Sequence, residues 1–272
     1  MIKISVVIPT YNRCDLLTPC ILSVAAQDYF LANDFEIIVV DDCSTDNTER
    51  VVQSLSSALR NIRYIKCEVK RGANFARNLG VKLAEGDIIF FQDSDDFWLP
   101  SKVSQQIGPL LYFNADAVFT PLLRVSRLRV TRYPTCFSNK SQLVTSKQIK
   151  LFLRKNPLST QCLAIRKDAF HTLQGFDESL PRFQDWELAL RMITQLKVYF
   201  LDIPSVIVNE SQVSITKDYK AGLVARKKIL EKHSHLLRQH KRYLLFRLDL
   251  IVRHFYLVLN TFIEGFRKEP SQ

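Results

Sequence analysis

Three carboxylates stand within four residues of the chain, at Asp93, Asp95 and Asp96. They follow the apolar run Asp87–Phe91, and carboxylates packed this closely repel one another unless a cation lies between them. Mg²⁺ and Mn²⁺ take carboxylate oxygens together with the phosphate oxygens of a substrate, so the Asp-x-Asp spacing suits a metal site. A solvated turn that ends a strand is the alternative, and the motif by itself does not separate the two.

Two further acidic positions carry possible chemistry. Asp41 and Asp42 end the apolar run FEIIVV, where a carboxylate can accept a hydrogen bond from a base or a ribose hydroxyl. An Asx turn leading into a helix explains that pair equally well. Asp185 lies near the start of the helical pattern at 183–196. Any helix favours an acidic residue there, and a carboxylate in that position can also stay ionised and accept a proton.

The elements that must position these residues alternate along the first half of the chain. Short β-branched apolar runs predict strands, and segments with helical spacing separate them. The predicted strands are 3–9, 35–40, 62–67 and 87–91, and the predicted helices are 15–28, 49–59 and 73–84. Four β-α units indicate an α/β fold with a mostly parallel sheet. Ligands bind outside the carboxyl ends of such strands, so we expect 9–13, 41–45 and 92–96 to converge.

The second half is less regular. It predicts strands at 115–120, 162–165 and 198–201, with helices at 101–113, 145–155 and 183–196. The segment 124–133 (RVSRLRVTRY) alternates basic and apolar residues, which predicts one half-exposed edge strand. Beyond about residue 217 the chain has a wholly helical pattern.

Charge divides the chain unevenly. Its 272 residues include 38 Lys+Arg and 27 Asp+Glu, a net of +11. Residues 217–272 hold 13 basic and 5 acidic side chains, a net of +8, so we expect a near-neutral domain at 1–216 and a basic, apolar helical region at 217–272. The apolar stretch 244–266 contains Arg247, Asp249 and Arg253, which disfavours a membrane span. Contact with anionic lipid and packing against protein, including a second copy of the chain, are equally compatible with it.

Several classes of site and protein are excluded or disfavoured. The six cysteines are scattered without a C-x-x-C pair, which argues against zinc. No G-x-G-x-x-G follows the first strand and no G-x-x-x-x-G-K occurs, so a Rossmann dinucleotide site and a P-loop are not expected. The start of the chain does not resemble a signal peptide, and a reducing cytoplasm is the expected location.

Five segments in order then resemble one known family. They are PTYNR at 9–13, VVDDCSTDNT at 39–48, GANFARNLG at 72–80, FQDSDDFWLP at 91–100 and GFDESLPRFQDWELALR at 175–191. Together they resemble the inverting glycosyltransferases of family 2, which have the GT-A fold, over about residues 1–215. The resemblance implies a mostly parallel central sheet flanked by helices, followed here by the C-terminal helical region.

The resemblance also implies roles for individual residues. Asp185 would be the general base, Asp95 would bind Mn²⁺ or Mg²⁺, and Asp93 would face the ribose. Asp41 is the best candidate for the residue that binds the nucleobase. Arg77 and Asn78 would lie near the nucleotide or brace the acidic loop. The full set expected to bind the nucleotide sugar is Pro9, Thr10, Tyr11, Arg13, Asp41, Asp42, Arg77, Asn78, Asp93 and Ser94.

Two departures from the family pattern stand out. Gln184 occupies a position where the family often has Glu, and Glu187 is the nearest acid that could compensate. Some members have His in a segment like H-x-x-S-x-S after the last strand, whereas this chain has Asn209 there, in the segment NESQVS. We expect that loop either to leave the metal to Asp95, phosphates and water, or to close over the donor.

The expected function is therefore metal-dependent transfer of a hexosyl or N-acetylhexosaminyl group from a nucleotide sugar, with UDP as the expected nucleotide. The expected acceptor is a hydroxyl of a glycan or lipid-linked molecule in bacterial surface polysaccharide or lipopolysaccharide synthesis, at the inner face of the cell membrane. A nucleotidyltransferase is disfavoured because PTYNR is not a Gly-rich basic loop. A nucleic-acid-binding protein is disfavoured because the strand ends are acidic, so no nucleic-acid partner is expected.

Overall fold

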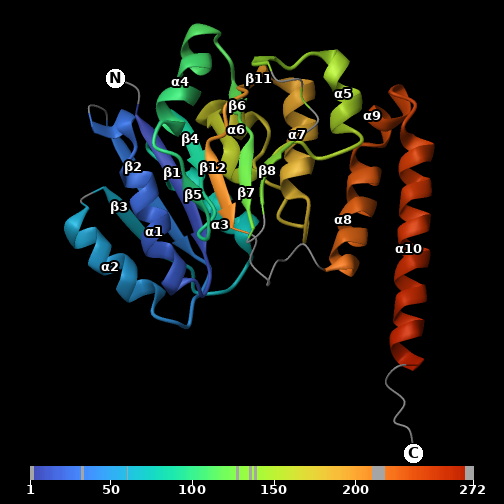
Figure 1. The fold of residues 1–272 in the computed structure, drawn as a ribbon, viewed down its shortest axis with the longest axis horizontal. Helices are drawn as coiled ribbons and strands as arrows, with labels where there is room; N and C mark the ends of the chain where they lie inside the picture. The colour runs from blue at the N-terminus through green and yellow to red at the C-terminus, as the bar shows by residue number, and fades with distance from the viewer. Residues whose placement is uncertain are drawn as a thin grey trace, which may run out of the picture.

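The computed structural model describes residues 3–31, 34–59, 61–126, 129–134, 137, 140–209 and 218–266. An eight-stranded sheet of order β3-β2-β1-β4-β10-β6-β11-β9 forms its centre (Figure 1). The strands are β1 (Ile4–Thr10), β2 (Phe35–Asp41), β3 (Ile62–Lys66), β4 (Ile88–Phe91), β6 (Ala117–Phe119), β9 (Gln142–Leu143), β10 (Leu163–Arg166) and β11 (Val198–Phe200).

The first four strands of this order run parallel, as the β-α alternation predicts. β1 pairs in parallel with β2 on one side and β4 on the other, and β2 pairs in parallel with β3. All seven residues of β1 are buried, which explains why its sequence is mostly apolar and does not alternate with exposed polar residues. β10 is antiparallel to both of its neighbours, β4 and β6. The mostly parallel α/β architecture predicted from the sequence is confirmed.

Helices cover both faces of the sheet. Side chains of α1, α2 and α4 join one hydrophobic cluster, and side chains of α3, α6 and α7 join the other. The helices of the main body are α1 (Cys14–Ala25), α2 (Thr48–Ala58), α3 (Ala73–Leu83), α4 (Lys102–Tyr112), α5 (Ile149–Phe152), α6 (Lys167–Thr172) and α7 (Gln184–Gln195), with short 3-10 turns at η1 (Asp28–Leu31), η2 (Ser146–Gln148) and η3 (Thr160–Cys162). Alternate residues of β1 point to opposite clusters, Val7 to one and Val6 to the other, as the period of a strand requires.

A second, four-stranded sheet corrects one prediction. Its order is β5 (Phe97–Trp98), β12 (Val206–Asn209), β7 (Leu122–Val125) and β8 (Val130–Tyr133). The segment 124–133 is therefore not one edge strand but parts of two antiparallel strands, in which Arg124 lies opposite Thr131. Alternation of basic and apolar residues continues through both strands, so the pattern gave no sign of the reversal. β8 does lie at the edge of this sheet.

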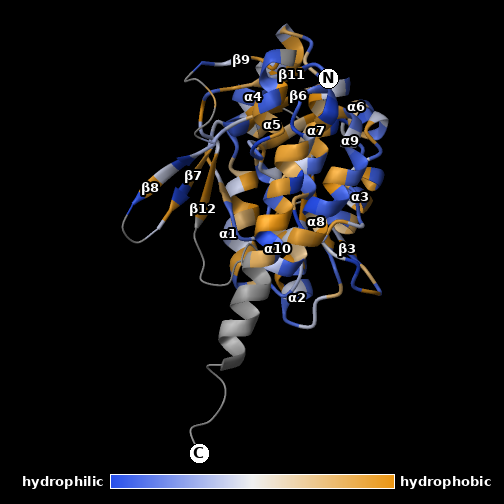
Figure 2. Ribbon diagram, turned by 90° about the vertical axis from the view of Figure 1, so that its right-hand side faces the viewer, coloured by the Kyte–Doolittle hydropathy of each residue, from blue (hydrophilic) through white to orange (hydrophobic). Residues whose placement is uncertain are grey.

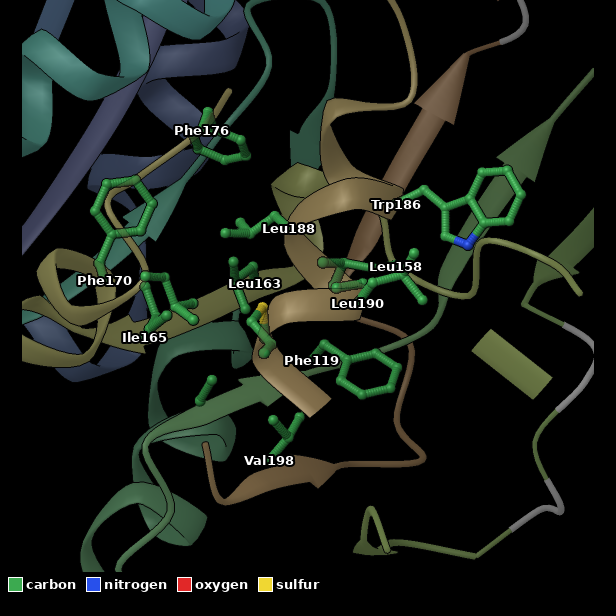
Figure 3. Close-up of a cluster of buried hydrophobic side chains, with 14 of the residues drawn as sticks. Phe119, Leu158, Leu163, Ile165, Phe170, Phe176, Trp186, Leu188, Leu190 and Val198 are labelled. Atoms are coloured by element: carbon green, nitrogen blue, oxygen red, sulfur yellow. The ribbon is translucent and has the colours of Figure 1, made fainter. Parts of the chain in front are cut away.

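The prediction of one helix over 145–155 was also wrong. That segment contains the short turn η2 and the four-residue helix α5. Phe152 of α5 is buried against Phe119 of β6, with ring centroids 6.1 Å apart. Figure 3 shows part of the same hydrophobic cluster, in which Leu188 of α7 points towards Leu163 of β10 while Trp186 projects to the other side of the helix. Packing of a few large side chains fixes this segment, rather than helix propensity.

The basic C-terminal region consists of α8 (Tyr219–Lys232), α9 (Ser234–Gln239) and α10 (Tyr243–Phe266). α8 and α10 lie side by side at one end of the molecule (Figure 1). Ile229, Leu237 and Phe246 are buried in the same hydrophobic cluster as Leu188 of α7, so the core runs across the change in composition at residue 217. Within the described part of the chain, no helix combines the length and the apolar character that crossing a bilayer requires.

Candidate active site

The polar segments after β1, β2 and β4 meet at one edge of the central sheet. Thr10 is in register with Asp41, and the amide of Asp42 donates to the carbonyl of Thr10 at 2.9 Å. The β4 strand lies on the other side of β1, and the amide of Gln92 donates to the carbonyl of Val7 at 3.0 Å. The predicted convergence of 9–13, 41–45 and 92–96 follows directly from this strand order.

The acidic cluster after β4 is a tight turn balanced by two arginines. The amide of Asp96 donates to the carbonyl of Asp93 at 3.1 Å. Arg77 Nη2 donates to Asp93 Oδ1 at 2.6 Å, and Arg13 Nη1 lies 3.5 Å from Asp95 Oδ2. Burial, followed by the charge of Asp93, raises the pKa of Asp95 despite the nearby arginines. The turn therefore presents two half-buried carboxylates in a place where a further cation would be stabilised.

Asp96 differs from its two neighbours. Its carboxylate is buried and accepts a hydrogen bond from Gln161 Nε2 at 2.8 Å, while its carbonyl accepts one from Gln92 Nε2 at 2.5 Å. Burial, followed by the charges of Asp93 and Asp95, raises the pKa of Asp96 well above that of an ordinary aspartate. Asp96 thus stabilises the turn through its hydrogen bonds to Gln161 and Gln92, whereas Asp93 and Asp95 remain half-buried. The sequence motif does not reveal this difference. Ser94 is buried within the same turn.

The Asp41-Asp42 pair is held by backbone amides and a tyrosine. Asp41 is fully buried, and its two oxygens accept from the Ser44 amide at 2.8 Å and the Tyr64 hydroxyl at 2.5 Å. Asp42 accepts from the amides of Arg71 and Gly72 at 2.7 and 2.8 Å. These carboxylates shape the loops that surround the strand ends, and any contact with a ligand would use their remaining lone pairs.

Two groups expected from the PTYNR segment lie in different environments. The Oγ1 of Thr10 is buried and has no hydrogen-bond partner among the described residues, whereas Tyr11 is partly exposed. Lys70 Nζ lies 3.5 Å from the centre of the Tyr11 ring, a cation–π contact that the sequence did not indicate. Pro9 is the last-but-one residue of β1 and pairs in register with Val40. The edge of the sheet therefore offers an aromatic face and an unused hydroxyl.

Helix α3 connects the acidic turn to the segment that precedes α7. Its residue Arg77 is 5% exposed, and the Nε and Nη1 atoms are buried without a partner among the described residues. The next residue is Asn78, whose Nδ2 donates to the Phe176 carbonyl at 2.9 Å and whose Oδ1 accepts from the Phe176 amide at 2.9 Å. Asn78 thus braces the loop before α7 rather than the acidic turn, whereas Arg77 contacts Asp93 within that turn.

Asn74 belongs to the same bracing set, although the sequence argument did not single it out. Its Nδ2 donates to the carbonyls of Asp177 and Leu180 at 3.1 and 3.0 Å. Asn74 and Asn78 are four residues apart and so lie on one face of α3, a spacing that could have identified the pair. Gly175 must stay small at this contact, because its φ is +68° and an added Cβ would lie 2.6 Å from Asn78 Oδ1.

Asp185 lies in the first turn of α7, and the charges of Asp93 and Arg77 act on its carboxylate. Burial raises the pKa of Asp185 to about 6, with a smaller contribution in the same direction from Asp93. Hydrogen bonds from Asn156 and from the Trp186 amide, together with the Arg77 charge, act in the opposite direction. A carboxylate with a pKa near 6 is ionised at neutral pH and is a stronger proton acceptor than an ordinary aspartate.

Glu187 does not serve as a partner for Asp185. It is fully buried and pairs with Arg191 Nη2 at 2.5 Å, Lys232 Nζ at 2.9 Å and His233 Nε2 at 3.1 Å. Although burial opposes ionisation, the bonds from His233 and Arg191 lower the pKa of Glu187 to about 2. Glu187 therefore anchors α8 to α7. The segment at 210–214, for which a closing loop was expected, lies outside the described residues.

The family model for "Glycosyl transferase family 2" matches residues 5–173, more than half of the sequence. The chain belongs to glycosyl transferase family 2. The match includes the strand ends and the acidic turn, and it ends at residue 173, before α7 and Asp185.

Individual relatives match this family 2 chain over different shares of its length. The putative colanic acid biosynthesis glycosyl transferase WcaA of Escherichia coli is 27% identical over 240 residues, which are 88% of this chain and 81% of WcaA. The glucosyltransferase WfgD of Escherichia coli, named for UDP-Glc and α-D-GlcNAc-diphosphoundecaprenol, is 37% identical over 43% of this chain and 44% of WfgD. The poly(ribitol-phosphate) β-N-acetylglucosaminyltransferase TarS of Staphylococcus aureus is 42% identical over 36% of this chain but only 17% of TarS.

The fold agrees with a solved structure of the same kind. The crystal structure of TarS residues 1–349 in complex with UDP superposes with a TM-score of 0.66 at 26% identity, covering 84% of this chain and 65% of that chain. The GT-A fold expected of the family 2 glycosyltransferase, with its central sheet flanked by helices, is therefore confirmed. This chain spans less than two thirds of that TarS structure.

Proposed function

We propose that this chain transfers a sugar from a UDP-sugar to a hydroxyl of a lipid-linked glycan during synthesis of a bacterial surface polysaccharide. UDP as the nucleotide is supported by the TarS complex with UDP and by the name of WfgD. A diphosphate-linked lipid as the carrier of the acceptor glycan is supported by the name of the same relative. Residues 217–272, with their basic excess, would favour work at an anionic membrane surface.

The observation that carries this proposal is the placement of Arg77. Its guanidinium bonds to Asp93 in the acidic turn, influences the ionisation of Asp185, and retains two buried nitrogens without partners among the described residues. Buried donors of this kind are costly unless a ligand supplies acceptors. Phosphate or sugar oxygens of a donor bound between the turn and Asp185 would satisfy them.

A divalent cation fits the chemistry of this site. Asp93 and Asp95 provide hard carboxylate oxygens, and Mg²⁺ or Mn²⁺ commonly completes its coordination with water and substrate phosphates. Within the described part of the chain no cluster of three or more possible ligands occurs, so phosphates and water would have to supply the other positions. Bound there, the ion would supply Lewis-acid stabilisation of the departing diphosphate.

The chain's own residues account for the rest of the proposed reaction. Asp185 would accept the proton of the acceptor hydroxyl as the oxygen attacks the anomeric carbon from the face opposite the diphosphate, which inverts that centre. Arg77 would hold Asp93 in place while sharing its free nitrogens with the donor. Asn74 and Asn78 would fix the approach to α7 and so the position of Asp185 relative to the donor.

Calorimetry with UDP and Mn²⁺ tests the donor site. We expect binding at micromolar to sub-millimolar affinity that EDTA removes, and we expect Asp95→Ala to abolish the metal-dependent part. Binding that EDTA and Asp95→Ala leave unchanged would contradict the metal site. A screen of UDP-sugars for metal-dependent hydrolysis then identifies the sugar without any need for an acceptor.

A matched pair of variants tests the base. Asp185→Asn should bind UDP normally and lose transfer. Asp168→Asn is the control, because Asp168 occupies the second position of α6 as Asp185 does in α7, and each carboxylate accepts from the amide of the next residue. Normal transfer by Asp185→Asn would show that another group accepts the proton.

A further inference from the structure

A cavity of about 200 Å³ lies between α7, α8 and α10, apart from the acidic turn. Four arginines line it, Arg154, Arg226, Arg242 and Arg253, together with the single acid Asp249. Trp186, the residue that follows Asp185, also forms part of the wall. The cavity is smaller than the roughly 300–1,000 Å³ of pockets that enclose whole drug-sized ligands, so it suits a compact head group.

The charges in this cavity are not balanced by the protein. Asp249 is shared between Arg226, at 3.0 Å, and Arg253, at 2.9 Å. No carboxylate pairs with Arg154 or Arg242 among the residues that the structure describes. Burial and the neighbouring Arg253 charge lower the pKa of Arg226, as expected where like charges crowd together. A net of three positive charges in one cavity favours an anion carrying more than one charge.

An exposed apolar surface on α10 adjoins the cavity. Leu244, Leu245, Leu248, Ile251, Val252 and Phe255 are each between 54% and 71% exposed. At 100° per residue these six positions occupy one face of α10, on the opposite side from Phe246 and Leu250, which pack on the core. Figure 2 shows α10 crossing the face of the molecule turned to the viewer. A helix on the surface of a globular protein normally turns polar residues to the solvent, whereas this face of α10 turns apolar residues to it.

Leu245 belongs both to this apolar face and to the wall of the cavity. A basic cavity and an apolar helix face therefore meet at one residue, and the cavity adjoins the helix turn that carries Asp185. A ligand that fits both surfaces must have a multiply charged anionic head and a long apolar tail. A single phosphate on a small molecule would leave the apolar face uncovered, and a hydrocarbon alone would leave the arginines unpaired.

We propose that the arginine-lined cavity binds the diphosphate of an isoprenoid-linked acceptor, with the isoprenoid chain lying along the apolar face of α10 at the membrane surface. This inference deepens the lipid-linked acceptor proposed above and rests on it. The arrangement would place the glycan on the Asp185 side of Trp186 while the lipid stays in the bilayer. Bidentate arginines are well suited to diphosphate oxygens, and the apolar face supplies a hydrophobic contribution of its own.

Fluorescence of Trp186 provides a direct test without any transfer reaction. Trp98 is the only other tryptophan, so Trp98→Phe leaves Trp186 as the sole reporter. In EDTA, farnesyl diphosphate should change its emission and bind at least tenfold more tightly than farnesol or inorganic pyrophosphate. Saturating UDP with Mn²⁺ should not displace it, because the donor site is separate. Equal affinity for farnesol, equal affinity for pyrophosphate, or displacement by UDP would each overturn the proposal.

Paired variants assign the binding to these residues. Arg154→Gln with Arg242→Gln should weaken farnesyl diphosphate binding at least tenfold, whereas Arg50→Gln with Arg129→Gln removes the same charge elsewhere and should not. Leu248→Ser with Val252→Ser should weaken farnesyl diphosphate but leave pyrophosphate unaffected. An equal loss in the two arginine pairs would show general charge attraction and overturn the site.

Two vesicle compositions separate the diphosphate from ordinary anionic lipid. Flotation with phosphatidylcholine vesicles containing geranylgeranyl diphosphate should exceed flotation with the same mole fraction of phosphatidylglycerol, and the Arg154/Arg242 variant should lose the difference. Equal flotation would overturn diphosphate recognition. UDP binding by each variant, measured separately, distinguishes failure of this inference from failure of the glycosyltransferase proposal.

Discussion

The ionisation of Asp185 links its burial to the pH dependence expected of the reaction. Because burial raises the pKa of Asp185 to about 6, the carboxylate is ionised at pH 7 and becomes protonated below about pH 6. We predict that kcat/KM for transfer falls about tenfold per pH unit below 6 and is level above it, since a protonated base cannot accept the acceptor proton. Initial rates measured between pH 4.5 and 8 with saturating metal test this, and a flat profile down to pH 5 would contradict it.

The same raised pKa predicts an effect on stability. Between the ordinary aspartate pKa and about 6, the folded state binds the Asp185 proton more tightly than the unfolded state, so stability decreases as pH rises through that range. At pH 7 the ionised, half-buried carboxylate of Asp185 is a cost to folding that Asp185→Asn removes. We predict a higher Tm for Asp185→Asn than for the wild type at pH 7, with the difference disappearing towards pH 4. An equal difference at both pH values would show that ionisation is not its cause.

The family resemblance suggested roles for Asp93, Asp95 and Asp41, but the motifs did not show which acidic side chains are buried and which are half-exposed. Asp93, Asp95 and Asp96 are chemically identical, and only the fold shows that Asp96 is buried against Gln161 and Gln92. Asp41 and Asp42 likewise differ only in which amides and hydroxyls they accept from. Burial and hydrogen-bond partners come from segments far away in the chain, which no local motif contains.

At the scale of elements, α3 is expected to control the position of Asp185. Its Asn78 side chain bonds to both the amide and the carbonyl of Phe176, within the loop that leads to α7. We predict that Asn78→Ala lowers kcat at least tenfold while the affinity for UDP with Mn²⁺ changes less than twofold, because the loop loosens and the donor site does not. Steady-state kinetics and calorimetry on the same preparation separate the two quantities.

The control for this prediction lies one turn further along α3. Lys82→Ala changes an exposed side chain of the same helix that contacts neither the loop nor the acidic turn, and its kcat should stay within twofold of the wild type. Asn78→Asp keeps one acceptor for the Phe176 amide and should recover part of the rate. If Asn78→Ala instead weakened UDP binding and left kcat unchanged, Asn78 would act on the donor rather than on α7.

Elements were predictable where burial gives a clear pattern. The continuous apolar runs of β1, β2 and β4 are buried on both faces of a parallel sheet, and their sequences show it. The β7–β8 pair and the short α5 were not predicted correctly, because alternation persists through a reversal and because a few aromatic contacts fix α5. Tertiary packing decides such segments, and single-sequence patterns do not contain it.

At the scale of the molecule, the two faces of α10 predict a large and a small loss of stability when a phenylalanine is replaced by alanine. Phe246 is 7% exposed and packs on Trp186 with ring centroids 5.7 Å apart, whereas Phe255 is 69% exposed on the apolar face. We predict that Phe246→Ala destabilises the whole protein by about 3–5 kcal/mol, the usual cost of removing a buried phenylalanine ring, and that Phe255→Ala changes stability by less than about 0.5 kcal/mol. Urea unfolding followed by circular dichroism measures both. A single transition that shifts as a unit in Phe246→Ala would show that α10 shares the stability of the catalytic core, while a separate early transition would show that the C-terminal helices unfold by themselves.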